Sequence, residues 1–463
     1  MKITKVLFGA VIVATLSAAA FSPTVNADDT SKSFTIKINS IISGDAMMSD
    51  GATYELQKIE NGTITTVSEK SSNVSGEISF DTLSFAANDS SSHFYRIIQK
   101  DSVAGLSTDK KIVYVRIVPS KDLLAYQDDT VYKTVNDGSG PHPFNATDEE
   151  LQGQAYVEWD PSTKVLTFFR DDEGKYENGQ QVDGKYYYTN FEKSTTGSTN
   201  RTWDSNYSIS NECIKVVFRD AIRPEGKMDR WFYNYKELVE ADIAKLDTSR
   251  ATTLAYFFNS AEKLEKIDIT KLDFTMIAQN ASSSYEVLDY FMSWVPGVEE
   301  FDFNNYAKIS ERQNRFMAGM LKDSGLRYLN TTSLNHEGTS AEFSNLACLE
   351  RVVVGEDYSF YRSSVTTSDD NWLKIETNKI DRFSRHMQTA PGGVPYNPES
   401  AGNYVRPICN TTPATFTSVY KKPIESPEEK TENPDTADYA PVAALLLGAS
   451  GFVAFFVFRA KRR

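Results

Sequence analysis

The stretch from Trp231 to Val354 repeats one spacing of apolar residues, and this spacing decides how the fold is interpreted. Its first copy lies in WFYNYKELVEADI, residues 231–243, and its second in FNSAEKLEKIDI, residues 258–269. Each copy places five residues at offsets of 0, +3, +6, +9 and +11. The steps of three suit one face of a helical turn, and the final step of two suits a short strand. The five copies comprise Phe232, Tyr235, Leu238, Ala241 and Ile243; Phe258, Ala261, Leu264, Ile267 and Ile269; Met292, Val295, Val298, Phe301 and Phe303; Met320, Asp323, Leu326, Leu329 and Thr331; and Phe343, Leu346, Leu349, Val352 and Val354.

The distance between copies indicates a stacked repeat. The copies begin 26, 34, 28 and 23 residues apart. A helical turn followed by a short strand at this period is typical of leucine-rich repeats, whose units stack and share one core. We therefore expect a leucine-rich-repeat α/β solenoid. The alternative is an ordinary α/β domain with accidental periodicity.

The residues around the spacing carry a family resemblance. Trp231-Phe232-Tyr233-Asn234 opens one copy and Leu246-Asp247-Thr248-Ser249 follows its strand, whereas Tyr256–Asn259 and Leu272–Thr275 do the same in the next. This alternation resembles the BspA-like leucine-rich repeats of bacterial surface proteins. The resemblance implies repeats over residues 210–356 and a C-terminal cap over residues 357–410. Copy four departs from the pattern, with Asp323 and Thr331 at core positions.

The region before the repeats, residues 28–195, predicts an antiparallel β-sandwich. Short alternating or aromatic-rich runs are separated there by polar turns. Seven or eight such runs suit a sandwich of two sheets. A polar linker over residues 196–209 separates this region from the repeats. The predicted strands include Phe34–Ile38, Ala52–Ile59, Gly76–Phe80, Phe94–Ile98, Ile112–Ile117, Ala155–Trp159, Val165–Phe169 and Tyr186–Asn190.

The order of these runs resembles the isopeptide-linked pilin domains of streptococci. The matching segments are Gly51–Leu56, Phe80–Phe85, Tyr95–Gln99 and Tyr188–Phe191. In that family a first-strand Lys is joined to a last-strand Asn by an amide bond that a buried Glu promotes. The resemblance assigns these roles to Lys37, Asn190 and Gln99. Because Gln99 can neither give nor take the proton that a Glu exchanges, we expect a β module without the crosslink.

The two ends of the chain predict export and attachment. Residues 1–27 have the charged, apolar and small-residue regions of a cleaved signal peptide. Residues 411–432 form a charged, proline-containing spacer. Residues 438–463 then supply an apolar run long enough to span a bilayer and a basic tail that stays in the cytoplasm.

The pentapeptide before the apolar run is the strongest functional signal. Asn433, Pro434, Thr436 and Ala437 lie in NPDTA, and the order of motif, span and basic tail resembles the sorting signal of sortase-anchored Gram-positive proteins. The resemblance implies that sortase cleaves after Thr436 and transfers its carbonyl to a peptidoglycan precursor. Asn433 and Ala437 stand where the usual motif has Leu and Gly, which leaves the sortase class open. A plain membrane anchor is the alternative.

Composition excludes several function classes. The net charge is −14, with no basic stripe, so we expect no nucleic-acid partner. Three Cys in an exported chain indicate no disulfide framework. No GxSxG, HExxH, P-loop or EF-hand spacing occurs, and we expect no enzyme activity, cofactor or metal. The sequence therefore predicts a cell-wall-anchored adhesin that binds a host or bacterial surface protein or glycan. The alternatives are a pilus or surface-fibre subunit and a surface hydrolase.

Overall fold

The structure is a computed structural model. It describes residues 30–43, 50–129, 142–171, 174–193, 201–204, 208–280, 287–302, 309–310, 317–337, 343, 345–356, 358–359, 371–382 and 401–421. The chain divides into two compact units, Met1–Tyr420 and Lys421–Arg463, and the elements below belong to the first. Among the described residues, no helix has the length and apolar character needed to cross a membrane, and the predicted span lies outside them.

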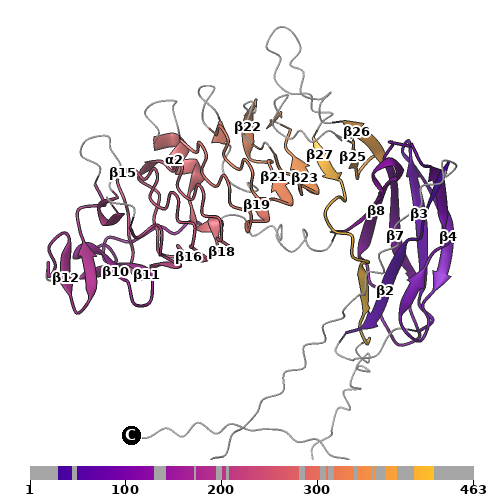
Figure 1. Ribbon diagram of the computed structural model, residues 1–463, viewed down its shortest axis with the longest axis horizontal. Helices are drawn as coiled ribbons and strands as arrows, with labels where there is room; N and C mark the ends of the chain where they lie inside the picture. The colour runs from indigo at the N-terminus through magenta and orange to yellow at the C-terminus, as the bar shows by residue number, and fades with distance from the viewer. Residues whose placement is uncertain are drawn as a thin grey trace, which may run out of the picture. The chain divides into compact units, whose positions relative to one another are not determined.

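The N-terminal region is built on a five-stranded antiparallel sheet in the order β4-β3-β7-β8-β9 (Figure 1). Its central strands bury alternate side chains on one face, as the residue pattern predicts. β4 lies at an edge and is mostly exposed. The strands are β3 (Thr53–Glu60), β4 (Thr63–Ser71), β7 (His93–Asp101), β8 (Ile112–Val118) and β9 (Leu123–Asp128), with a 3-10 helix at Pro119–Lys121.

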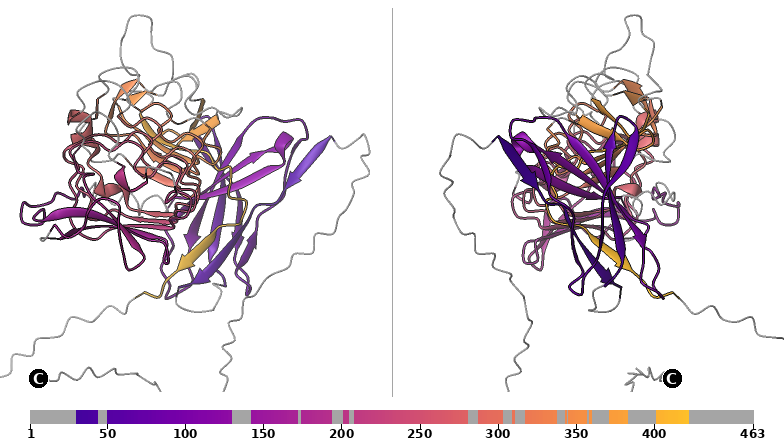
Figure 2. Two further views of the ribbon diagram at one scale, coloured as in Figure 1. Left: turned by 60° about the vertical axis from the view of Figure 1, so that its left-hand side comes forward. Right: turned by 90° about the vertical axis from the view of Figure 1, so that its right-hand side faces the viewer.

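A second sheet of this region takes a strand from the far end of the chain. β2 (Lys37–Ile42) pairs antiparallel with β5 (Glu77–Ser79) and parallel with β28 (Thr415–Ser418). Figure 2 shows the C-terminal strand, in yellow, beside the indigo strands. The fully buried Phe416 of β28 packs in the same core as strands β2, β3 and β8. The start of the predicted spacer, residues 411–432, is therefore a structural strand. A two-stranded pair, β1 (Ser31–Phe34) and β6 (Leu83–Ala86), accompanies these sheets.

Strands that the sequence assigned to the first domain belong to another sheet. β10 and β11 lie within a seven-stranded sheet, β12-β13-β10-β11-β14-β16-β18, and β11 pairs parallel with β14. Their inward residues share one core with residues 203–404. The N-terminal region thus ends near residue 129. The strands of the sheet are β10 (Gln154–Asp160), β11 (Val165–Asp171), β12 (Gln180–Val182), β13 (Lys185–Tyr188), β14 (Lys215–Phe218), β16 (Glu240–Asp242) and β18 (Lys266–Ile267).

The predicted leucine-rich-repeat α/β solenoid is wrong. Among the described residues one α-helix is present, α2 (Phe274–Asn280), and the rest of the regular structure is almost entirely strands distributed over several sheets. Two short 3-10 helices, Thr202–Asp204 and Ile269–Lys271, add little. We call residues 142–405, as far as the structure describes them, the central region.

Left-handed residues explain why the steps of three do not become helices. Arg230 and Asn234 flank the start of the first copy, and Tyr256 and Ser260 flank the start of the second; all four have φ between 58° and 64°. A residue with positive φ cannot continue a right-handed helix. The amide of Arg230 donates to the oxygen of Ala255 in the next copy, at 2.9 Å, rather than four residues back. The spacing nevertheless marks burial: of its described positions, all but Ile267, Ile269 and Asp323 are buried.

The last sheet of the central region changes from parallel to antiparallel pairing. Its order is β19-β21-β23-β27-β25-β26; β19, β21 and β23 are parallel, and β27 is antiparallel to both β23 and β25. The strands are β19 (Glu300–Asp302), β21 (Tyr328–Asn330), β23 (Arg351–Val354), β25 (Asn371–Lys374), β26 (Lys379–Arg382) and β27 (Gly402–Val405). Smaller sheets join β15 (Gly226–Lys227) to β17 (Ala251–Thr253), and β20 (Ile309–Ser310) through β22 (Leu334–Glu337) to β24 (Tyr358–Ser359).

Candidate functional site

The predicted sorting residues Asn433, Pro434, Thr436 and Ala437 lie outside the described residues. The signal peptide over residues 1–27 also lies outside them. Both stay predictions from the sequence.

The three residues assigned to an amide crosslink are not brought together. Lys37 lies in β2, where its Nζ contacts the Glu77 carboxylate at 2.9 Å and its side chain is half exposed. Asn190 follows β13 in the seven-stranded sheet, is exposed and has φ of 64°. Lys37 is thus held in an ion pair in one sheet while Asn190 follows a strand of another. The assignment of Asn190 fails because β28, not β13, is the last strand of the N-terminal region.

Gln99 lies in a buried polar cluster that the sequence did not reveal. Its Nε2 donates to Ser418 Oγ of β28 at 3.2 Å, and its Oε1 accepts from the Asp109 amide at 2.7 Å. Ser40 of β2 and Tyr54 of β3 share a hydrogen bond of 2.5 Å. Burial raises the pKa of Tyr54 to about 12. The cluster joins strands far apart in sequence, so no local pattern signals it.

The most regular solvent-facing feature is a row of aromatic side chains on the turns of the central region. We call Tyr233, Tyr256, Tyr290 and Trp294 the aromatic row. The rings of Tyr256 and Tyr290 stack with centroids 5.1 Å apart and planes 15° apart, and those of Tyr290 and Trp294 are 6.3 Å apart and 4° from parallel. Tyr233 meets Tyr256 edge-on at 6.4 Å. Three of these rings are half-buried, and Trp294 is 40% exposed.

The backbone of neighbouring turns positions this row. The amide of Tyr256 donates to the backbone carbonyl oxygen of Asp289 at 2.8 Å, and the amide of Tyr290 donates to that of Ala318 at 2.9 Å. Both residues have positive φ, so their side chains leave equivalent points of successive turns. Gly319 continues the series with φ of 61°, and a Cβ there would lie 2.6 Å from the Tyr290 ring. The glycine thus makes room for the ring.

Two cations contact rings of the row. The Arg230 guanidinium lies 4.6 Å from the Tyr256 centroid, and Lys322 Nζ lies 5.3 Å from the Trp294 centroid. Each attraction contributes about 0.5–1 kcal/mol at an exposed site. Arg230 also pairs with Asp229, and Lys322 with Asp323, so the row carries little net charge. Two exposed pairs on nearby turns, Lys236–Glu262 and Lys263–Glu237, add further balanced charge.

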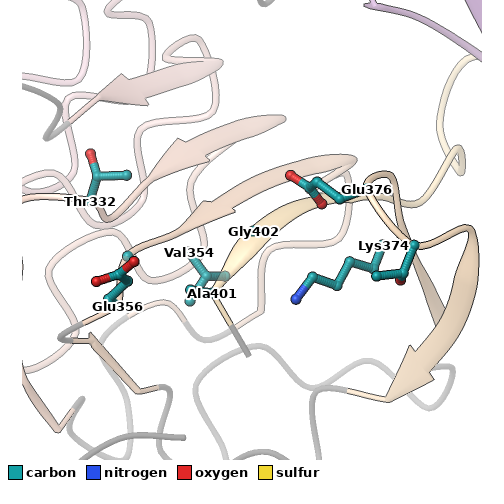
Figure 3. Close-up of a pocket in the computed structure, with 9 residues that line it drawn as sticks. Thr332, Val354, Glu356, Lys374, Glu376, Ala401 and Gly402 are labelled. Atoms are coloured by element: carbon teal, nitrogen blue, oxygen red, sulfur yellow. The ribbon is translucent and has the colours of Figure 1, made fainter. Parts of the chain in front are cut away.

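A pocket of about 570 Å³ lies at the ends of β23, β25 and β27 (Figure 3). Glu356, Lys374 and Glu376 contribute charged side chains to it. The Glu376 carboxylate accepts from the backbone amide and the side-chain amide of Asn403, at 2.9 and 2.6 Å. Gly402 has φ of 141°, and a Cβ there would lie 2.7 Å from Lys374 Cε. The nine described lining residues include no His or Cys.

One cysteine pair differs from the sequence prediction. Cys348 and Cys409 form a disulfide with Cα atoms 5.5 Å apart, whereas Cys213 is buried and free. The prediction of no disulfide framework therefore missed one bridge, because a pair separated by 61 residues has no local signature. Burial raises the pKa of the Cys213 thiol to about 12, which makes it unreactive. The described residues hold no group of three or more His, Cys, Asp or Glu that could bind a metal ion.

No protein-family model matches the chain, and no curated protein matches it.

Proposed function

We propose that this chain is an exported surface protein, attached to the cell wall through Thr436, that binds a protein partner on the aromatic row. The aromatic row is the observation that carries the proposal. Tyr, Trp and Arg are the residues that most often dominate protein–protein binding energy. The row presents them on consecutive turns of one scaffold.

Three further features support a protein partner. The row is nearly neutral, and ion pairs lie on nearby turns. Polar and charged groups of this kind form the rim of protein interfaces. The faces of Tyr256 and Tyr290 stack on each other, which leaves mainly edges and hydroxyl groups for a partner. None of the four residues of the row lines the pocket beside Glu376.

The Cys348–Cys409 bridge supports export. Disulfides persist in oxidising compartments outside the cytosol and are rare within it. The sorting motif at residues 433–437 then gives the means of attachment.

Binding is tested with the purified chain on panels of intact animal and bacterial cells, each untreated, protease-treated or periodate-treated. We expect binding that protease removes and periodate leaves. Trp294→Ser and Tyr256→Ser should each weaken it at least tenfold, about 1.4 kcal/mol. Val74→Ser is the matched control, because Val74 is 83% exposed in the N-terminal region. Loss of binding with periodate alone would instead indicate a glycan partner, and equal binding by all variants would exclude the row.

Attachment is tested by fractionating cells that express the chain or its Thr436→Ala variant. The parent should be released only by wall-digesting enzymes, and the variant should move to the membrane or the medium. A parent chain that detergent alone extracts would indicate a plain membrane anchor.

A further inference from the structure

The segment from Gly402 to Tyr420, which we call the return segment, connects the two regions. Its first strand, β27, lies against β23 of the central region, and its second, β28, lies against β2 of the N-terminal region. The Asn410 oxygen accepts from the Tyr126 amide at 2.8 Å, between these strands. Everything C-terminal of Tyr420 is therefore connected to the folded unit through this segment.

Because of their register, β23 and β27 separate easily when force is applied in one direction. Arg351 pairs with Val405, and Val354 pairs with Gly402. The chain enters β23 beside Arg351 and leaves β27 beside Val405, so both connections lie at the same end of the pair. Tension between the central region and the C-terminus would separate that end first. The antiparallel hydrogen bonds would then break one after another rather than together.

The disulfide closes this end of the pair. Cys348 precedes β23 by three residues and Cys409 follows β27 by four, and their Cα atoms are 5.5 Å apart. Tension arriving at Cys409 passes across the sulfur atoms to Cys348. The bridge therefore bypasses the 61-residue separation between them.

The buried carboxylate of Glu350 stabilises the same end of the β23–β27 pair. Glu350 is fully buried, and its Oε1 accepts from the amides of Ile408 and Cys409 at 3.1 and 2.9 Å. Its other oxygen accepts from Arg327 Nε of the preceding turn at 3.0 Å. Arg406 donates to the Leu349 oxygen at 3.1 Å. Charge-assisted hydrogen bonds of this kind are about twice as strong as neutral ones.

We propose that Cys348–Cys409 and Glu350 form a mechanical clamp that carries tension from the C-terminus into the central region without extending the residues between the two cysteines. The inference rests on the proposed attachment and partner, because only a chain held at its C-terminus and on the aromatic row is pulled in this direction.

The β28 strand, which pairs with β2 on one side, is also held on its other side. Lys111 Nζ donates to the Thr415 oxygen at 2.5 Å, and the Thr417 amide donates to Asp109 Oδ2 at 2.8 Å.

The clamp is tested by pulling single full-length chains between a bio-orthogonal handle at position 263 and one at the C-terminus. Lys263 is exposed and pairs only at the surface with Glu237. Adding dithiothreitol should introduce one new extension step at a force below every other step. Its length should be about 200 Å, from a separation of 61 residues at roughly 3.4 Å each.

Two variants separate the bridge from other effects. Cys213→Ser should leave the response to reductant unchanged, because Cys213 is not part of the bridge. Glu350→Gln should lower the force of the new step under reductant. Traces that are identical with and without dithiothreitol, or a new step at the force at which the central region unfolds, would overturn the proposal. Because handles replace the wall and the partner, these results do not depend on the cell-binding and fractionation tests.

Discussion

The N-terminal and central regions are both built from short strands, but they close in different ways. In the N-terminal region the sheet is completed by β28, a strand more than 300 residues away in the sequence. Phe416 of that strand completes the core around Tyr54. In the central region, strands from successive turns lie side by side, as β14, β16 and β18 do. Removing one contact should therefore disable the N-terminal region as a whole, whereas the central region should respond locally.

The largest expected effect of a single substitution is that of Phe416→Ala on the N-terminal region. Phe416 is fully buried and its ring lies 5.1 Å from that of Tyr54. Truncating a buried Phe costs about 3–5 kcal/mol. The five Trp of the chain lie outside residues 31–129, so Trp fluorescence reports on the rest of the molecule. We expect a lower unfolding midpoint by circular dichroism with little change by Trp fluorescence.

The control for this comparison is Tyr420→Ala, in the same segment. Tyr420 is 57% exposed, so the change should leave both midpoints nearly unaltered. If Phe416→Ala shifted the two signals equally, the two regions would unfold as one and the contrast between them would not hold.

Reducing Cys348–Cys409 should have an effect of similar size, and in the other region. Closing a loop of 61 residues lowers the entropy of the unfolded chain. By the chain-entropy relation this stabilises the fold by about 4 kcal/mol. Urea unfolding followed by Trp fluorescence, with and without dithiothreitol, measures it. An unchanged midpoint would mean that the reduced chain already holds these two segments together.

The difference between the regions also shows where sequence reasoning succeeded. Strand prediction was good where alternation is local: the predicted Ile112–Ile117 corresponds to β8, Ile112–Val118. It failed for β28, because pairing between Ile41 and Thr417 leaves no mark within either segment. In the central region the spacing located the buried residues but predicted the wrong backbone conformation. Positive φ at Tyr256 and Tyr290, which are neither Gly nor Asn, could not be read from residue type.

For the candidate site, aromatic residues on the turns were visible in the sequence, but their stacking was not. Tyr256 and Tyr290 lie 34 residues apart, and only the pairing of successive turns brings their rings to 5.1 Å. The cysteine bridge and the Gln99 cluster were missed for the same reason, since each joins segments that only the folded chain brings together.

Alkaline pH should affect the N-terminal region through its buried tyrosines. Burial raises the pKa of Tyr54, Tyr95 and Tyr114 from 10.0 to about 12. A raised folded-state pKa means that stability is complete below pH 10 and is lost as the pH rises towards 12. Each tyrosine contributes about 2–3 kcal/mol of this loss, at 1.36 kcal/mol per unit of pKa.

Tyr54 tests the alkaline effect because it contacts both Ser40 and Phe416. Tyr54→Phe should cost about 1 kcal/mol at neutral pH, since Ser40 loses its partner. It should also lessen the loss of circular dichroism between pH 10 and 12. An identical alkaline transition in the variant would show that other tyrosines control it.

Covalent mass distinguishes the Lys–Asn crosslink that the sequence suggests from the disulfide that the structure contains. A Lys–Asn amide bond would release ammonia and lower the mass by about 17 Da. A disulfide removes two hydrogens, about 2 Da. Since Lys37 is exposed and paired with Glu77, while Asn190 lies in another sheet, we expect only the smaller change. Peptide mapping should recover fragments with Cys348 and Cys409 joined until reductant is added. A fragment joining Lys37 to any Asn would show that the N-terminal region closes covalently, and β28 would then be a secondary means of closure.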